Sequence, residues 1–376
     1  MSLWQRPRPS RGSIAARACI AGVLACLPAL TAGTSPGLSR AKIQAIERVI
    51  TAEMARQKVP GVTIAVGAGS RLVWSKGFGR ADLENAAPAT TATVYRIGSI
   101  SKPITAVAVM QLVERGRLDL EAPIQKYVPS FPRKPWPITA RELLAHMSGI
   151  RHYRTADEMY STRHYVDLLA PLEIFADEPL QFEPGTHYSY TTYGYSLLGA
   201  AVEAASGMRF LEYLRRNIFE PAHMQQIRQD DIFEVVPNRA HGYRRGPNGT
   251  IQNCAPADTS NKIPGGGLVS TAEDLVRFVA ALQRDALLRR ETRAQMFTPQ
   301  HTRDGKPVPY GLGWALAERG GGSRWVTHAG SQPGVSTYLL AAPEEGASVA
   351  VLANLEGVRL HPLSARILSI VLERAE

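Results

Sequence analysis

The sequence predicts an α/β fold in which a largely antiparallel sheet is flanked by helices and a helical lobe is inserted between its strands. A hairpin of β-branched and apolar residues lies near the start of the chain, at 62–76. Further hairpin strands follow only near the end, at 325–354, so the strand pairs are mostly antiparallel. Segments of helical periodicity fill the interval. We therefore expect an α/β lobe formed by about residues 41–95 and 268–376, and a helical lobe formed by about residues 99–265.

Residues 1–33 have the features of a secretory signal peptide rather than of this fold. Four arginines and no acidic residue precede a short apolar run at 20–30, and small residues follow it, as at a signal cleavage site. That run is too short to span a bilayer comfortably. We therefore expect a periplasmic or secreted protein. An uncleaved membrane anchor, a mitochondrial-type presequence and a lipoprotein acylated at Cys26 are the alternatives.

Composition excludes some classes of function. The 376 residues include 43 Lys and Arg against 33 Asp and Glu, and removing the four leader arginines lowers the formal net charge from +10 to about +6. No run of five or six basic residues remains, so no nucleic acid partner is expected. Cys19 and Cys26 lie in the leader and Cys254 is alone, so the mature protein has no internal disulfide.

The first elements of the expected fold follow the leader in order. A helix is expected at 41–56, where five apolar residues lie on one stripe. Pro60-Gly61 ends it, and strands at 62–66 and 71–76 form the hairpin. Thr139 and Glu142 predict a capping box for a short helix that Gly149 stops. His146, inside that helix, is expected to be structural rather than catalytic.

The rest of the chain contains irregular, helical and strand segments. Residues 151–180 are polar and irregular and are expected to form a loop over the site. Helices are expected at 196–205 and 210–219, and a Gly-rich turn at 265–267 precedes a helix capped by Ser270 or Thr271. The late strands and the closing helix are expected at 312–316, 325–331, 337–342, 348–354 and 363–374.

Ser99 and Lys102 are the residues with the clearest chemical meaning. An apolar run of helical spacing opens just after them and closes at Gly116, which places both in the first turn of a helix. Residues at i and i+3 share a face, so the amine lies beside the hydroxyl. The helix N-terminus favours negative charge there, and a serine hydroxyl needs such help to act as a nucleophile. The alternative is a capping serine followed by a solvated lysine.

Together with motifs further along the chain, this stretch resembles the serine β-lactamase and penicillin-binding protein superfamily. Ser99-Ile100-Ser101-Lys102 matches the nucleophile motif of that family. Tyr190-Thr191-Thr192 falls where class C β-lactamases and related carboxypeptidases and esterases carry Tyr-x-Asn, and His328-Ala329-Gly330 falls where the family has Lys-Thr-Gly. The contexts at 143–149 and 265–275 also match.

The resemblance implies a β-lactamase/transpeptidase-like fold and a role for each of these residues. Ser99 would attack a carbonyl, with Lys102 and Tyr190 as a coupled proton relay. Either relay group, if unperturbed, costs about 4–5 kcal/mol to deprotonate at pH 7. The backbone N–H groups of Ser99 and Ser331 would form the oxyanion hole. The residues implied to contact the substrate are Thr192, His328, Ala329 and Gly330. No cofactor is implied, and no His, Cys or carboxylate cluster has the spacing of a metal site.

Two departures from the family pattern bear on the substrate. Thr192 replaces an amide that can both donate and accept, so recognition of an acylamido side chain is in doubt. His328 replaces a permanent cation with an imidazole expected to gain its proton only near pH 6.5, so a substrate carboxylate loses its usual partner. This pair of motifs is similar to the mitochondrial β-lactamase-like serine proteases of animals and their bacterial relatives, and to some esterases of the family.

The expected function is that of an exported serine hydrolase acting through an acyl-enzyme on a peptide, an ester or a β-lactam. The two departures favour an esterase or peptidase over an efficient β-lactamase. The alternatives are a penicillin-binding, sensor-like protein that is acylated without turnover and a D-alanyl-D-alanine carboxypeptidase. The expected partner is a small-molecule or peptide substrate, and the acyl donor and oligomeric state are left open.

Overall fold

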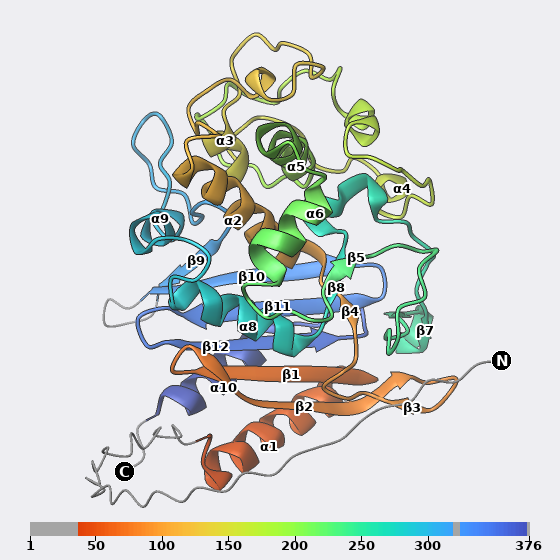
Figure 1. Cartoon of the computed structure of the whole chain (residues 1–376). Helices are drawn as coiled ribbons and strands as arrows, with labels where there is room; N and C mark the ends of the chain where they lie inside the picture. The colour runs from red at the N-terminus through yellow and green to blue at the C-terminus, as the bar shows by residue number, and fades with distance from the viewer. Residues whose placement is uncertain (1–36, 319–323, 374–376) are drawn as a thin grey trace, which may run out of the picture. The chain divides into compact units, whose positions relative to one another are not determined.

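The computed structural model describes residues 37–318 and 324–373, and it confirms the predicted α/β class (Figure 1). The expected signal peptide at 1–33, with Cys19 and Cys26, lies outside the described residues. The chain from Gly37 onward forms one compact unit, and the boundaries of the two expected lobes within it stay a prediction. No helix in the described ranges combines the length and the apolar character needed to cross a membrane.

The central sheet has seven strands, and every adjacent pair is antiparallel. The early hairpin pairs with the last strand of the chain, which closes the sheet from both ends of the sequence. In spatial order the strands are β3 (Ala87–Pro88), β2 (Arg71–Asp82), β1 (Gly61–Ala68), β12 (Ala347–Ala353), β11 (Val335–Ala342), β10 (Arg324–Gln332) and β9 (Ala315–Glu318).

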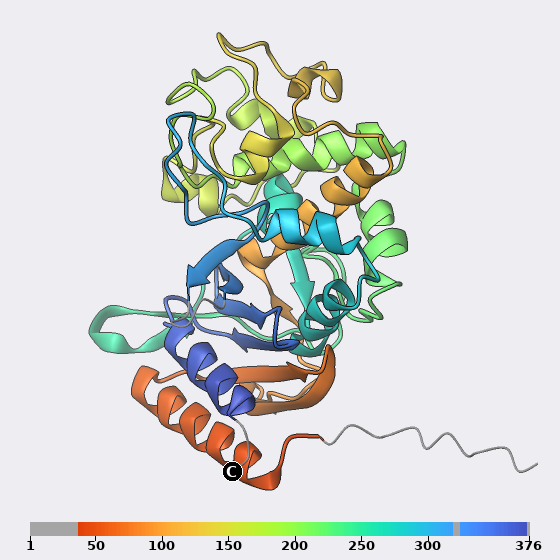
Figure 2. The same ribbon diagram turned by 90° about the vertical axis from the view of Figure 1, so that its left-hand side faces the viewer.

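Helices cover both faces of this sheet. On one face, α1 (Arg40–Gln57) and α10 (His361–Leu372) lie side by side (Figure 2). The opposite face packs against α8 (Ala272–Gln283). Ile64 of β1 joins the apolar cluster of the first face, whereas its neighbour Ala65 joins the cluster that contains Leu275 of α8. Because both faces are buried, the central strands are apolar at successive positions instead of alternating with polar residues.

The helical part packs around α2 (Ser101–Glu114), which is buried from Ser101 to Leu112. A helix that is apolar all round belongs in a core, and α2 contacts α5 and α7 there. The other helices are α3 (Ala140–Leu144), α4 (Ala156–Met159), α5 (Tyr193–Ser206), α6 (Phe210–Leu214), α7 (Ile263–Gly266) and α9 (Arg290–Met296). Two small sheets complete the fold: β4 (Tyr95–Arg96), β8 (Leu268–Ser270) and β5 (Arg228–Gln229), and the hairpin β6 (Tyr243–Arg245) and β7 (Ile251–Asn253).

Several local predictions match the structure and others differ from it, among them the strand expected at 312–316, which is β9 at Ala315–Glu318. The capping box at Thr139 is present, and Thr271 caps α8. The helix at Thr139 ends before His146, which adopts a positive φ of 59°, and so does not extend to Gly149. The Gly-rich stretch at 265–267 is not a plain turn, because its first two residues close α7. The helix at 210–219 is α-helical only to Leu214 and continues as one π-helical turn.

Candidate active site

Ser99 lies in a 3₁₀ turn, Gly98–Ile100, that leads directly into α2. The turn begins at Gly98, whose φ of +52° lies in the left-handed region, which glycine adopts without steric cost. A Cβ on Gly98 would lie 2.8 Å from the backbone nitrogen of Ser331. Glycine at this position therefore lets the turn that carries Ser99 pack directly against β10.

The Lys102 ammonium lies beside the Ser99 hydroxyl. Its Nζ is 3.0 Å from Ser99 Oγ, 3.1 Å from Thr192 Oγ1 and 2.7 Å from the carbonyl oxygen of Gly265. The side chain has no exposed surface and no carboxylate partner among the described residues. Burial, and then the charge of Lys262, lower the pKa of Lys102 well below its ordinary value. This environment therefore favours the neutral amine next to the Ser99 hydroxyl.

Tyr190 is the third member of the predicted trio, and its side chain lies close enough to that of Ser99 to be influenced by it. Lys102 Nζ lies 4.8 Å from the centre of the Tyr190 ring. Burial raises the pKa of Tyr190 far above neutrality, and the proximity of Ser99 offsets only part of this. The environment therefore moves the two pKa values of the expected relay apart, so that Tyr190 keeps its proton while Lys102 can take one.

Thr192 faces Lys102 and also lines the cleft. Its hydroxyl accepts a hydrogen bond from the ammonium and contacts the side chain of Tyr153. Its backbone N–H donates to Nδ1 of His152 at 3.3 Å. The hydroxyl is thus already engaged within the site, consistent with the expectation that it cannot replace the amide of an asparagine in substrate recognition.

His328 is buried on β10 with both ring nitrogens engaged. Nδ1 lies 2.8 Å from the carbonyl oxygen of Ala329, which can only accept, so Nδ1 carries the proton. Nε2 then accepts from the hydroxyl of Tyr310, also at 2.8 Å. Burial, and then the nearby charge of Lys102, lower the pKa of His328 to about 3. The expectation that this imidazole gains a proton near pH 6.5 is therefore wrong, because burial disfavours the charged form of the ring.

The edge of β10 that follows His328 provides the backbone groups expected at the site. β9 pairs with β10 only as far as Thr327, so residues 328–332 have no strand on that side within the described ranges. A Cβ on Gly330 would lie 2.1 Å from both the Ile97 carbonyl oxygen and Thr337 Oγ1. This close packing, together with that at Gly98, sets the turn that carries Ser99 directly against the part of β10 that contains Ser331.

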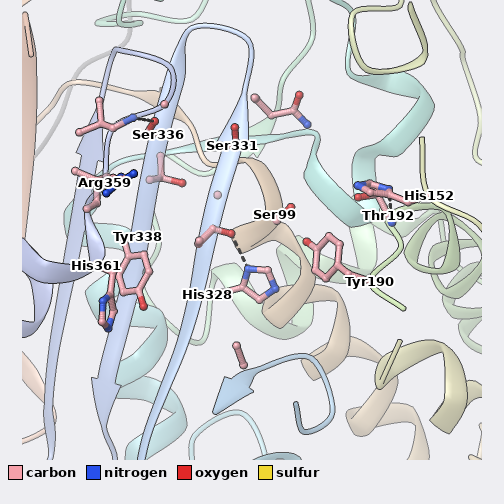
Figure 3. A pocket seen from close by; sticks show the side chains of 18 of the residues that line it. Ser99, His152, Tyr190, Thr192, His328, Ser331, Ser336, Tyr338, Arg359 and His361 are labelled. Atoms are coloured by element: carbon pink, nitrogen blue, oxygen red, sulfur yellow. Dashed lines mark hydrogen bonds between the residues drawn. The ribbon is translucent and has the colours of Figure 1, made fainter. Parts of the chain in front are cut away.

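These residues line a cleft of about 790 Å³. In Figure 3, Ser99, Tyr190 and His328 lie around one end, whereas Arg359 and His361 lie beyond β11. Arg359 is the only permanently charged residue among those that line the cleft in the described part of the chain, and much of the rest of the wall is aromatic or apolar. Within those ranges, no group of three His, Cys, Asp or Glu side chains could hold a metal ion.

Sequence reasoning predicted some neighbours of the site and missed others. His146 was expected to be structural, and the structure buries it with its ring 4.3 Å from that of Tyr190, accepting from the Thr191 N–H. Tyr310 and Lys262 were not singled out, since neither lies in a motif and only tertiary packing brings them to the site. The segment at 151–180 was expected over the site, and His152 and Tyr153 do line the cleft.

Comparison with known proteins places the chain in a family. The family model described as Beta-lactamase matches residues 46–371. The human mitochondrial serine beta-lactamase-like protein LACTB is 29% identical over 82% of this chain and 76% of its own. Among solved structures, the octameric penicillin-binding protein homologue from Pyrococcus abyssi has a TM-score of 0.76 at 29% identity, covering 88% of this chain and 77% of that one.

A second solved structure adds an enzyme to these relatives. The D-amino acid amidase from Ochrobactrum anthropi, complexed with L-phenylalanine amide, has a TM-score of 0.74 at 25% identity and covers 88% of this chain and 98% of its own. Relatives with hydrolase activity and relatives named as penicillin-binding proteins therefore share the architecture that brings Ser99, Lys102, Tyr190 and His328 together here. The chain belongs to the beta-lactamase family, within the serine β-lactamase and penicillin-binding protein superfamily.

Proposed function

We propose that this protein is an exported serine hydrolase that forms an acyl-enzyme on Ser99 and acts on an ester or peptide bond. One observation carries the proposal: the Lys102 amine lies 3.0 Å from Ser99 Oγ, fully buried, with no carboxylate partner among the residues that the structure describes. A serine hydroxyl becomes a good nucleophile only beside a group that removes its proton. A buried amine with a lowered pKa is such a group.

The mechanism follows from the positions of these groups. Ser99 Oγ attacks the carbonyl carbon and its proton passes to Lys102. The negative charge that develops on the carbonyl oxygen is stabilised by the backbone N–H groups of Ser99 and Ser331, and a donor of this kind contributes about 3–4 kcal/mol to the transition state. The protonated Tyr190–Lys102 pair then returns a proton to the leaving group. Water then attacks the carbonyl carbon of the acyl-enzyme while its proton passes to the same pair, the bond from that carbon to Ser99 Oγ breaks, and Oγ takes the proton back as the acid is released.

The charges around the cleft support neutral esters and peptides as better substrates than β-lactams. A β-lactam carries a carboxylate close to its reactive carbonyl, and His328 stays neutral where the wider family has a lysine. The remaining permanent cation of the lining, Arg359, lies beyond β11 (Figure 3). The amidase among the similar structures supports hydrolysis of a bond next to a carbonyl.

Turnover is the experiment that tests this proposal. We expect p-nitrophenyl acetate or butyrate to release nitrophenol continuously, well beyond one equivalent of protein. A cephalosporin should be hydrolysed with a kcat/KM at least about tenfold lower, because a desolvated charged hydrogen bond is worth about 1.5–3 kcal/mol and the site has none to offer beside Ser99. Stopped-flow and steady-state absorbance measure both reactions.

Other results of that experiment identify the alternatives. Release that stops at one equivalent indicates a penicillin-binding, sensor-like protein that is acylated without turnover. Preferential cleavage of a peptide ending in D-alanyl-D-alanine indicates a carboxypeptidase. Efficient cephalosporin hydrolysis at neutral pH contradicts the argument from His328.

Export is the second part of the proposal, and its support is the arginine-rich segment and short apolar run of residues 1–33. We expect the mature protein to begin after about residue 31 and to be found outside the inner membrane. N-terminal sequencing of the protein from its producing cell measures this. A soluble cytoplasmic protein that starts at Met1 contradicts export, and an acylated Cys26 identifies a lipoprotein instead.

A further inference from the structure

A second buried lysine lies next to the site and has no part in the mechanism so far. Lys262 has no exposed surface, and its Nζ donates to the carbonyl oxygen of Met159 at 2.7 Å. The same ammonium lies 4.9 Å from the centre of the Tyr153 ring. One carbonyl and one aromatic face are weak compensation for burying a full positive charge, so the presence of this lysine requires an explanation.

No carboxylate in the described residues is paired with Lys262. The nearby Asp230 binds the guanidinium groups of Arg96 and Arg239. Asp258, the other acid in its surroundings, lies 2.7 Å from His164. Both acids that could neutralise Lys262 are therefore engaged elsewhere, and the positive charge of the ammonium acts on the groups beyond it.

Two structural links join Lys262 to Lys102. The first is the backbone of α7, which begins directly after Lys262 and whose Gly265 carbonyl oxygen accepts from Lys102. The second runs through side chains, because Tyr153 lies under the Lys262 ammonium and is adjacent to Thr192, which accepts from Lys102. Lys262 thus supports the same wall of the site that holds the Lys102 ammonium.

We propose that Lys262 is a positioning residue whose buried positive charge disfavours a second charge on Lys102 and so keeps that amine ready to take the Ser99 proton. The inference rests on the proposed function, since it assigns the origin of the basic form of Lys102. Two buried amines in one wall act as a coupled pair in which protonation of one opposes protonation of the other.

The electrostatic environment of both amines is consistent with this role. Burial, and then Arg96, lower the pKa of Lys262 to about 7, with Asp230 and Asp258 acting in the opposite direction. Lys262 is thus mostly charged below pH 7 and mostly neutral well above it. The other titratable groups around the two amines are Tyr153, Glu158, Tyr190, Tyr195, His146, His152 and His328.

Three substitutions of Lys262 separate its charge from its hydrogen bond. Lys262→Met removes both, Lys262→Gln keeps a donor toward Met159 without the charge, and Lys262→Arg keeps the charge. Lys76→Met is the matched control. It removes a lysine of β2 that pairs with Glu47 of α1, and β2 lies on the far side of the sheet from β10. Each variant is assayed for kcat/KM on p-nitrophenyl butyrate and for the rate of fluorophosphonate labelling, from pH 5 to pH 10.

The acid limb of these profiles reports the proton on the catalytic base. We expect the midpoint of the limb to move up by about one pH unit in Lys262→Met and Lys262→Gln, which corresponds to a roughly tenfold lower rate at pH values below the wild-type midpoint. Lys262→Arg and Lys76→Met should keep the wild-type midpoint, and all profiles should converge above about pH 9. The midpoint does not depend on the fraction of active protein, so partial unfolding of a variant does not hide the result.

The proposal is overturned if Lys262→Gln keeps the wild-type midpoint, since the hydrogen bond rather than the charge would then be the role of Lys262. It is equally overturned if all three Lys262 variants shift the limb alike. Absence of Ser99-dependent turnover and labelling in the wild-type protein is a different result, because it removes the proposed function itself. Normal wild-type turnover with unshifted Lys262 variants removes only this inference.

Discussion

The Ser99→Ala variant should not react with a fluorophosphonate probe, and its kcat/KM for p-nitrophenyl esters should fall by a factor on the order of 10⁴ or more. Alanine has no oxygen to form the ester bond of the acyl-enzyme, so the two-step route is lost and only binding and the oxyanion donors remain. Mass spectrometry of the labelled protein and ester hydrolysis measure the two effects independently.

Ser101→Ala is the matched control, because Ser101 lies in the same motif but its hydroxyl donates to the Gly98 carbonyl oxygen at 2.8 Å, away from Lys102. That variant should lose about 1 kcal/mol of stability with its buried hydrogen bond and should still be labelled. Labelling of Ser99→Ala at the wild-type rate, or loss of labelling only in Ser101→Ala, means that the nucleophile has been assigned to the wrong residue.

The parts of the site that the sequence predicts are those that local geometry fixes. Ser99 and Lys102 are three residues apart at the start of a helix, so the backbone alone brings them together. Tyr190 and His328 lie far along the chain, and only the order and spacing of motifs identified them. The sheet was predictable for a similar reason. The early hairpin contains β1, the late hairpins contain β12, and these two strands pair with each other.

Other features depend on packing that no local pattern encodes. The neutral state of His328 could not be read from its ordinary pKa, because it is set by burial, by Lys102 and by bonds to Tyr310 and Ala329. The same holds for Lys262, which lies in a stretch without a motif and is buried against the Met159 carbonyl oxygen and the Tyr153 ring, both far away in the sequence. Sequence gives the kinds of groups at the site, and tertiary burial sets their protonation.

Lys102→Met should reduce activity and stabilise the protein at the same time. Removing the base should lower kcat/KM for a p-nitrophenyl ester by about 10²–10⁴. The free energy of unfolding at pH 7 should nevertheless rise by about 1–3 kcal/mol. Methionine has a similar length, so the substitution leaves little empty space, and it removes a buried group that the fold holds only at a penalty.

The stability estimate compares two opposing contributions. Holding an ordinary lysine unprotonated at pH 7 costs about 4–5 kcal/mol. Leaving the Gly265 carbonyl oxygen without the Lys102 donor costs about 1–3 kcal/mol, which offsets only part of that gain. Thr192 Oγ1 also loses the Lys102 donor, but its hydroxyl keeps its contact with Tyr153.

The pH dependence gives the sign of this effect and a second measurement. Because burial lowers the pKa of Lys102, the unfolded chain binds a proton that the folded protein lacks between that lowered pKa and about 10.5. Stability contributed by this group therefore increases as pH rises through that window. The stability advantage of Lys102→Met, measured by urea unfolding, should be largest at neutral pH and should shrink toward pH 10.

Lys306→Met is the control, because it removes an exposed lysine paired with Asp304, and its stability difference from wild type should show no such trend. A Lys102→Met protein that is less stable than wild type at pH 7 would mean that the hydrogen bonds of the ammonium outweigh its burial, and Lys102 would then be a structural cation rather than a base.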